Sequence, residues 1–400
     1  MPFDHVVVVM MENHSFDNLL GALPRSGQAA ADGLTFNEAG AATNSNPGTT
    51  GTPPEVTAFP FPSTAQGPHV SQTWNATHEQ IDGGRMDGFV RSVGATQPMG
   101  YYTREVLPFA YSLASTFTLA NRWFASAPCM TVPNRRFLMA GTAYGSIATD
   151  VQSFGDAPPP NGTIFDRLHA HRISWRNYFT DLPYTAIIPS IIEKYPTNLA
   201  PITQFYRDCA AGTLPSVSFV DPEVGVLSFI GKQLASLPVL GTIASGLATV
   251  GGDEEPPQDM SYGEAWAHRV VEAVLRSPAW PRTLLIYTYD EHGGYYDHVP
   301  PPAAVAPDSI PPKLTPTDAP GGYDIYGPRV PAVVASPYSK PNAVTNVIHD
   351  HTSVLATIEA KWNLPALTYR DANAATVMDF LDVSHAAFLT PPTIQAPPSP

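Results

Sequence analysis

Apolar residues in this chain occur in short continuous runs that end abruptly in polar side chains. The two clearest runs, residues 6–11 and 283–289, end in the polar pairs Glu12-Asn13 and Asp290-Glu291. Uninterrupted apolar runs of this length predict strands that are buried on both faces, as in a parallel sheet. Ligands of open α/β sheets bind beyond the carboxyl ends of the strands. We therefore expect the two polar pairs to meet there, where their oxygen donors would suit a divalent cation.

Segments with helical spacing alternate with these and other strand-like runs. Further strands are predicted at residues 173–178, 215–220 and 329–336. Helical patterns cover residues 74–82, 103–117, 131–141, 261–275 and 352–362. Thr131, and Ser261 together with Glu264, are expected to cap two of these helices. The alternation predicts a three-layer α/β fold with a central, mostly parallel sheet flanked by helices.

The chain of 400 residues is long enough to bury a large core, and its 44 prolines favour long ordered loops. We expect a single domain at residues 1–388 with loop excursions at 24–73 and 225–259. Residues 389–400 form a Pro-rich tail. Cys129 and Cys209 match no metal-binding spacing, and whether they pair stays open.

The charge balance is acidic, with 21 basic against 35 acidic residues. This argues against a nucleic-acid partner, because phosphate backbones are bound by Lys and Arg. No signal peptide precedes the first strand, so we expect a cytoplasmic protein, or a secreted or periplasmic one if a leader was removed. No stretch predicts a transmembrane segment. Residues 233–252 carry no charge, and they predict either a helical cover on the core or a lid in transient contact with a lipid surface.

Six motifs occur in a fixed order along the chain: residues 11–17 (MENHSFD), 84–89 (GRMDGF), 131–135 (TVPNR), 289–299 (YDEHGGYYDHV), 327–331 (GPRVP) and 350–353 (DHTS). Together they resemble the phosphoesterase family of non-haemolytic phospholipases C and acid phosphatases, which belongs to the alkaline-phosphatase superfamily. The resemblance spans nearly the whole chain. It implies an alkaline-phosphatase-like fold and metal-assisted hydrolysis of phosphate esters.

The resemblance also implies roles for individual residues. Thr131 takes the place of the family's nucleophile and would form a phosphothreonine. The metal ligands would be Glu12, Asn13, Thr131, Asp290 and Glu291. Oxygen ligands favour Ca, Mg or Mn, whereas Zn is expected if histidines join them. Asn134 and Arg135 could contact the substrate phosphate, although Arg135 could equally pair with a carboxylate.

Several titratable residues are candidates for proton transfer, with a structural role as the alternative for each. His292, His298 and His351 lie within the family motifs. Family members often carry two further histidines, but here Gln72 and Glu255 stand at those positions. His69 and His78 flank Gln72 and could contact the substrate phosphate instead. Glu255 could donate a proton if burial raised its pKa, and otherwise its charge would repel a phosphate.

The sequence therefore predicts a metal-dependent phosphoric ester hydrolase, a phospholipase C-like phosphodiesterase acting through Thr131. Its substrate would be a small phosphate ester or a phospholipid head group. An acid phosphatase acting on monoesters is the alternative. A phosphate- or metal-binding protein without catalysis is the alternative from another class.

Overall fold

The computed structural model describes residues 1–150, 157–223, 252 and 254–398. A central sheet runs through the molecule in the strand order β12-β6-β11-β10-β1-β9-β7-β8. The strands are β1 (His5–Met11), β6 (Thr118–Ala120), β7 (Trp175–Phe179), β8 (Leu199–Pro201), β9 (Val217–Asp221), β10 (Thr283–Tyr289), β11 (Ala332–Ala335) and β12 (Val344–Thr345). The predicted central strands are thus confirmed, and β1 lies in the middle.

Most neighbouring strands are parallel. β1 pairs in parallel with β10 and β9, and β7 continues the parallel arrangement to β8. β11 is antiparallel to both β10 and β6. The register of β1 and β10 runs from His5 opposite Thr283 to Met11 opposite Tyr289. The two strands therefore end level, which brings the residues after Met11 and Tyr289 to one edge.

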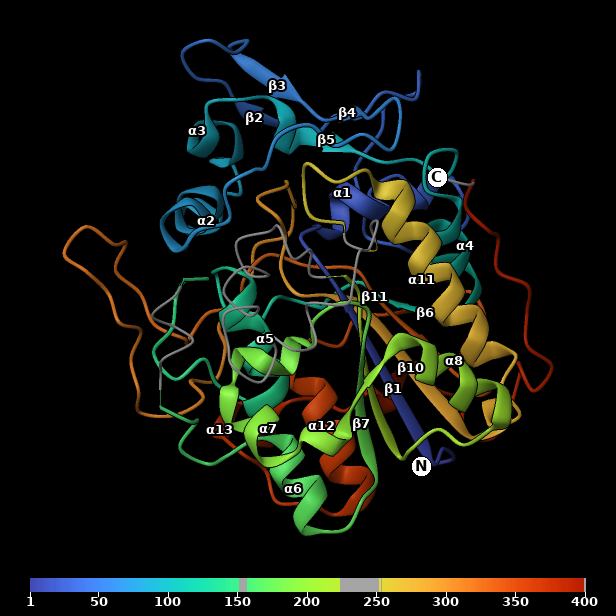
Figure 1. The fold of residues 1–400 in the computed structure, drawn as a ribbon. Coiled ribbons are helices and arrows are strands. Elements are labelled where there is room, and N and C mark those ends of the chain that lie inside the picture. The colour runs from blue at the N-terminus through green and yellow to red at the C-terminus, as the bar shows by residue number, and fades with distance from the viewer. Residues whose placement is uncertain (151–156, 224–251, 253, 399–400) are drawn as a thin grey trace.

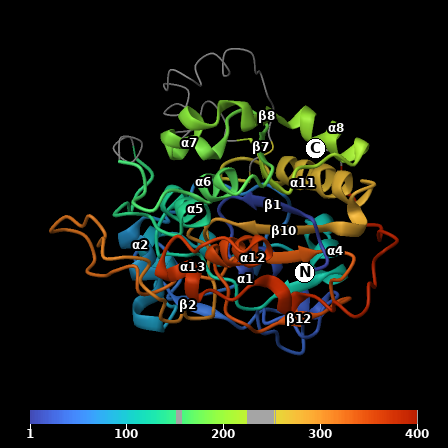
Figure 2. The same cartoon turned by 90° about the horizontal axis from the view of Figure 1, so that it is seen from below.

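Helices cover both faces of the sheet, as the two views show (Figures 1 and 2). One layer contains α4, α8 and α11, and the other contains α5, α6 and α12. The helices are α1 (Phe16–Leu20), α2 (Trp74–Ile81), α3 (Phe89–Val93), α4 (Pro108–Thr116), α5 (Thr131–Ala140), α6 (Ile164–Ala170), α7 (Pro189–Lys194), α8 (Ile202–Ala211), α11 (Met260–Leu275), α12 (Thr352–Trp362) and α13 (Tyr369–Asn373). The predicted three-layer α/β class is confirmed.

Both predicted helix caps are wrong. Met130 is the N-cap of α5 and Thr131 is its first helical residue. Asp259 is the N-cap of α11, where its carboxylate accepts a hydrogen bond from Ser261 N–H. The Glu264 carboxylate instead accepts the N–H groups of Phe109 and Ala110 at the start of α4. A buried carboxylate stabilises a neighbouring helix N-terminus in the same way as a local cap does.

The excursion at residues 24–73 forms the hairpin of β2 (Ser45–Pro47) and β3 (Glu55–Thr57) and the strand β4 (Phe59–Pro60), which pairs with β5 (Gly100–Tyr101). These elements lie beyond the carboxyl end of β1 (Figure 1). The expected lid at 233–252 lies outside the described residues, apart from Gly252. Within the described part of the chain, no helix has both the length and the apolar character needed to cross a bilayer. Cys129 and Cys209 are buried and free.

Candidate active site

The ends of β1 and β10 meet as the sequence predicts. Asn13 N–H donates to Asp290 Oδ1 over 3.2 Å, and Asp290 N–H donates to the carbonyl of Met11. Asn13 has the left-handed backbone φ of 67°, a conformation that Asn tolerates better than most residues. The chain therefore turns sharply after Glu12, and the polar residues of both strand ends share one buried location.

Two glycines after Glu291 allow this close approach. Gly293 has a φ of 65°, and a Cβ atom there would overlap the Asn13 carbonyl. Gly294 has a φ of 75°, and its Cβ would overlap the carbonyl of Ser71. Gly293 N–H also donates to Glu291 Oε2 over 2.8 Å. Glycine is therefore required at both positions for steric reasons as well as for the positive φ.

Thr131 comes from a different part of the chain, at the start of α5. Its hydroxyl lies 3.5 Å from Asn13 Oδ1 and is buried. The next N–H of the helix, that of Val132, donates to the Thr149 hydroxyl. The Asn134 amide bonds the backbone of Ala127, Cys129 and Met130. Asn134 thus shapes the loop that presents Thr131, and its predicted contact with phosphate stays a prediction.

Arg135 pairs with the carboxylates of the strand ends. Its Nε donates to Asp290 Oδ2 over 3.1 Å, and its Nη2 lies 3.5 Å from Glu12 Oε1. The guanidinium also donates to the carbonyls of Met10 and Met11, and it stacks on the Tyr184 ring at 3.5 Å. Of the two roles predicted for Arg135, the structure contains the carboxylate pairing. We call Glu12, Asp290, Glu291 and Arg135 the Arg135 cluster.

The Arg135 cluster holds three buried carboxylates and one guanidinium. Burial raises the pKa of Asp290, and Arg135 opposes this. Burial and then the charge of Asp290 raise the pKa of Glu291 well above its ordinary value. Glu291 Oε1 has no hydrogen bond within the described residues. Excess negative charge and a buried oxygen without a donor fit a divalent cation, with Asn13 Oδ1 and Thr131 Oγ1 as neutral oxygen ligands.

Two predicted histidines lie beside this cluster. His292 Nε2 bonds Gln80 Oε1 over 2.7 Å, and its Nδ1 lies 3.2 Å from Glu291 Oε2. His351 Nε2 donates to the Asp290 carbonyl over 2.6 Å. Burial lowers the pKa of His292 to about 3 and that of His351 to about 4. Both rings are neutral and anchored, and their catalytic roles stay predictions.

His298 belongs to a second buried cluster, which we call the Arg329 cluster: Asp17, Asp297, His298 and Arg329. Arg329 donates to both carboxylates at 2.9–3.3 Å and stacks on the ring of Phe16. His298 Nδ1 lies 2.6 Å from Asp17 Oδ2. Among the described residues, Asp17, Asp297 and His298 are the group of acidic and histidine side chains whose ligand atoms lie within 4.8 Å of one another. Arg329 already offsets their negative charge.

Gln72 and Glu255, which stand where family members often carry histidine, both lie beside His69. His69 Nε2 is 3.5 Å from Glu255 Oε1 and 3.0 Å from Gln72 Nε2. His78 is placed differently, because its Nδ1 bonds the carbonyl of Trp74 in its own helix and its Nε2 lies against Gly321. The structure thus associates His69, and not His78, with the Glu255 carboxylate.

Sequence reasoning missed Asp221, the last residue of β9. Its Oδ2 accepts the N–H of Tyr184 and the amide of Asn177, and the charge of Arg135 acts on it. Burial raises the pKa of Asp221 to about 7. The signal was visible, because the predicted strand at 215–220 also ends in a carboxylate.

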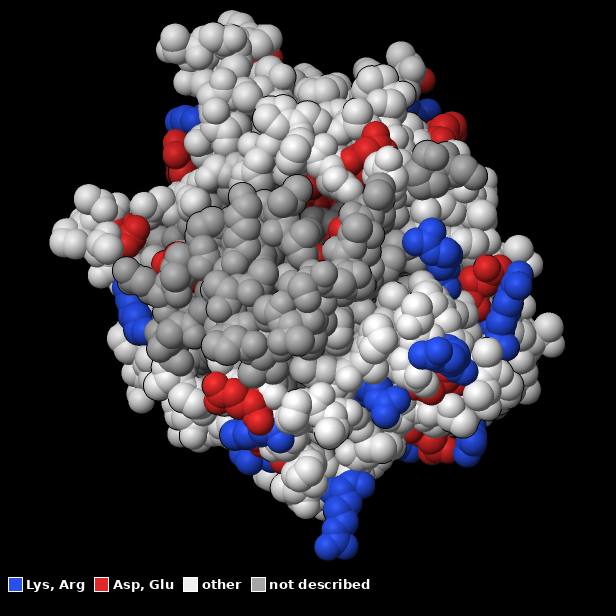
Figure 3. Space-filling model, viewed as in Figure 1, with Lys and Arg blue, Asp and Glu red and all other residues white. Residues whose placement is uncertain are grey.

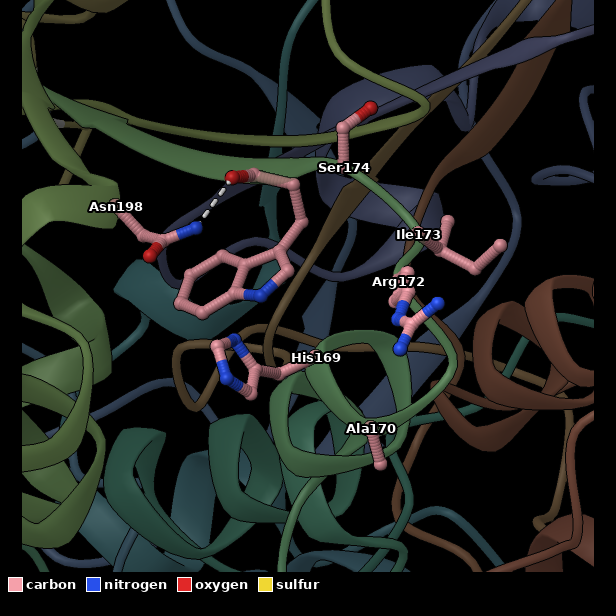
Figure 4. Close-up of a pocket in the computed structure, with 7 residues that line it drawn as sticks. His169, Ala170, Arg172, Ile173, Ser174 and Asn198 are labelled. Carbon is pink, nitrogen blue, oxygen red and sulfur yellow. Dashed lines mark hydrogen bonds between the residues drawn. The ribbon is translucent and has the colours of Figure 1, made fainter.

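A surface cavity lies away from this site. A cavity of about 600 Å³, lined by His169, Trp175 and Asn198, lies where β7 begins (Figure 4). Since β7 runs parallel to β9 and β1, this cavity is at the edge opposite the site. On the face in Figure 3, Asp and Glu atoms are visible inside a central hollow, whereas Lys and Arg lie nearer the rim.

The sequence model of the phosphoesterase family matches residues 3–365. The chain belongs to the phosphoesterase family. This phosphoesterase is 32% identical to non-specific phospholipase C6 of Arabidopsis thaliana, over 99% of this chain and 74% of the relative. It is 28% identical to phospholipase C A of Mycobacterium tuberculosis, over 98% of this chain and 79% of the relative. The prediction of a phosphoric ester hydrolase is confirmed at the level of the family.

Solved structures with a similar chain path have much lower identity. A protein of the alkaline phosphatase superfamily from Vibrio parahaemolyticus has a TM-score of 0.38 at 11% identity, covering 84% of this chain and 74% of its own. The lipoteichoic acid synthase LtaP from Listeria monocytogenes has a TM-score of 0.42 at 10% identity, covering 93% of this chain and 76% of its own.

Proposed function

We propose that this phosphoesterase cleaves phosphodiesters in the manner of a phospholipase C, through a covalent phosphothreonine at Thr131. The observation that carries the proposal is the position of the Thr131 hydroxyl, buried and 3.5 Å from Asn13 Oδ1 at the shared end of β1 and β10. A covalent route divides one difficult displacement into two easier steps. The Thr131 oxygen attacks phosphorus and displaces one alcohol of the diester. Water then attacks the phosphothreonine, breaks the bond from phosphorus to Thr131 Oγ1 and releases the phosphate monoester.

The surrounding residues prepare Thr131 for this step. Asn13 orients the hydroxyl, and Arg135 fixes the carboxylates of Glu12 and Asp290. Glu12, Asn13, Asp290 and Glu291, with Thr131 Oγ1, would hold a divalent cation such as Ca, Mg, Mn or Zn. Such an ion lowers the pKa of a bound hydroxyl and offsets the charge of the phosphate.

The names of the curated relatives favour a diester over a monoester. Those cited above are phospholipases C, which cleave a phosphodiester. The discriminating assay compares a phosphatidylcholine with an aryl phosphate monoester at equal concentration. We expect faster turnover of the phosphatidylcholine, and faster turnover of the monoester would support the acid phosphatase alternative.

Thr131→Ala tests the nucleophile. We expect kcat to fall by about 10⁴-fold or more, as for nucleophiles of other covalent hydrolases, while Thr131→Ser retains measurable activity. Chelation of divalent cations should also abolish turnover, and adding them back should restore it. An unchanged rate in Thr131→Ala would remove the covalent route. A parent protein inactive on every ester would favour the non-catalytic binding protein.

A further inference from the structure

The cluster of His69, Gln72 and Glu255 holds one edge of an imidazole and leaves the other edge open. Glu255 and Gln72 both contact His69 Nε2. No hydrogen bond from His69 Nδ1 occurs among the described residues. The His69 side chain is 43% exposed, whereas Gln72 is only 2% exposed. A buried amide and a carboxylate thus orient a ring that is partly open to solvent.

The segment that carries His69 packs directly on the active-site loop. The Ser71 carbonyl lies against Gly294, close enough to exclude any Cβ there. Gln80 joins the two segments, because its Nε2 donates to Ser71 O over 2.8 Å and its Oε1 bonds His292. His69 therefore lies two residues before Ser71, which contacts Gly294 in the loop that follows Glu291.

Glu255 is anchored to the same place from another direction. The carbonyl of its neighbour Glu254 accepts the ring N–H of His14 over 3.1 Å and the amide of Gln66 over 2.6 Å. His14 directly follows Asn13. After burial and Asp290, the charge of Glu255 is a further cause of the raised pKa of Glu291. The Glu255 carboxylate thus contacts His69 and also acts electrostatically on Glu291.

We propose that His69 is the proton donor to the leaving oxygen, through Nδ1, and that Glu255 and Gln72 position its ring. This inference rests on the proposed function. As Thr131 Oγ bonds to phosphorus, the bond from phosphorus to the leaving oxygen breaks. The leaving oxygen keeps the electron pair and takes the proton from Nδ1. When water attacks the phosphothreonine, Nδ1 takes a proton from that water and the imidazolium is restored.

Gln72 can hold the ring through Nε2 in both states of this step. Nε2 carries a proton before and after Nδ1 gives up its own, so the step needs an acceptor at Nε2. The Gln72 amide lies 3.0 Å from Nε2 through its Nε2 atom, and its Oε1 is buried without a partner among the described residues. Rotation of the amide by half a turn places Oε1 toward the ring, where it accepts the Nε2–H.

The decisive experiment varies the leaving group. The full chain and His69→Gln are assayed on short-chain phosphatidylcholine, whose leaving alcohol needs a proton, and on 4-nitrophenyl phosphorylcholine, whose nitrophenolate does not. We expect His69→Gln to lose about 10²–10³-fold on the first substrate, within the range of general acids, and to change little on the second. Glu255→Gln should lose less on the first substrate, because Gln72 still holds the ring, and it should change little on the second. His171→Gln is the matched control, because His171 is exposed and bonded only within its own turn.

Equal losses on both substrates would make His69 merely structural, and no loss would remove it from the reaction. Either result overturns the inference while leaving the proposed function intact, provided that Thr131→Ala is inactive. A parent protein inactive on both substrates would instead overturn the proposed function. If the parent prefers monoesters, glycerol phosphate and 4-nitrophenyl phosphate form the same comparison.

Discussion

The Arg135 cluster and the Arg329 cluster both combine buried carboxylates with one arginine, but their carboxylates are not paired to the same extent. In the Arg329 cluster the guanidinium donates to Asp17 and Asp297, and also to the carbonyls of Asp32 and Asn121. His298 supplies a second positive charge. In the Arg135 cluster one guanidinium faces three carboxylates, and Glu291 Oε1 has no donor within the described residues.

The difference in carboxylate pairing is what we expect between a structural network, the Arg329 cluster, and a ligand site, the Arg135 cluster. Buried charges in proteins are normally paired or bound to metals, because an unpaired charge is costly to bury. The Arg329 cluster satisfies that requirement with side chains alone. In the Arg135 cluster, by contrast, Glu291 Oε1 has no hydrogen-bond donor among the described residues, and the cluster lies beside a hydroxyl at a helix start. Incomplete pairing, rather than acidic composition, therefore favours the Arg135 cluster as the proposed site.

The largest expected effect is on stability, through Arg329. Arg329→Met should lower the free energy of unfolding by about 3–5 kcal/mol, because it leaves the carboxylates of Asp17 and Asp297 buried without a partner. Urea unfolding at neutral pH measures it. Arg122→Met is the control, since its ion pair with Asp32 is partly exposed and should contribute about 0–1 kcal/mol. Equal losses of unfolding free energy in Arg329→Met and Arg122→Met would show that the buried Arg329 cluster stabilises the protein no more than an exposed ion pair does.

Glu291→Gln should lower activity without lowering stability, unlike Arg329→Met. We expect kcat to fall by about 10²–10³-fold, as when one preorganised charge-stabilising group is removed. Stability without divalent cations should be equal or higher, because burial and Asp290 already disfavour an ionised Glu291, and glutamine stays neutral there. Asp297→Asn should instead lower stability and keep the activity per folded molecule. The comparison fails if Glu291→Gln, freed of cations, unfolds as easily as Arg329→Met.

Cation binding should stabilise the protein through the Arg135 cluster alone. At a free cation concentration of 100 times Kd, a site that exists only in the folded state adds about 2.7 kcal/mol. Thermal unfolding with chelator and with added Ca, Mg, Mn or Zn measures the shift. We expect it to vanish in Glu291→Gln and to persist in His298→Gln. The reverse result would assign the cation to Asp17, Asp297 and His298.

The parts of this site that were predictable depend on local pattern. The apolar runs of β1 and β10 are long enough to identify buried strands, and the polar residues that follow them must lie at a sheet edge. The paired glycines at 293 and 294 predict close backbone approach, which the overlaps with Asn13 and Ser71 confirm. The helix from Thr352 to Trp362 has the bounds that its spacing indicates.

The parts that were not predictable depend on pairings between distant segments. Arg135 could have faced phosphate or carboxylate, and only the positions of Glu12 and Asp290 decide between them. The same holds for Glu264, which stabilises α4 although its spacing suggested a cap for α11. Asp297 and His298 are neighbours in the sequence and lie in a loop, where they converge on Arg329, 32 residues from Asp297, and on Asp17, 281 residues from His298.

The smallest expected effect is a pH dependence that belongs to the Arg329 cluster. Burial lowers the pKa of His298, but the charges and hydrogen bonds of Asp17 and Asp32 outweigh it and raise the pKa to about 10. The folded protein thus holds a proton that the unfolded chain releases near pH 6.5. The resulting stability is fully present below about pH 6.5 and is lost as the pH rises toward 10. His298→Gln should remove this slope, which we expect to amount to about 1–2 kcal/mol after allowing for solvent screening. Urea unfolding from pH 6 to 10 measures it, with the exposed His171→Gln as the control.

The contradicting outcome is the same dependence of stability on pH in the parent and in His298→Gln. In that case the protonated His298 ring would not stabilise the Arg329 cluster, and Arg329 alone would neutralise the carboxylates of Asp17 and Asp297.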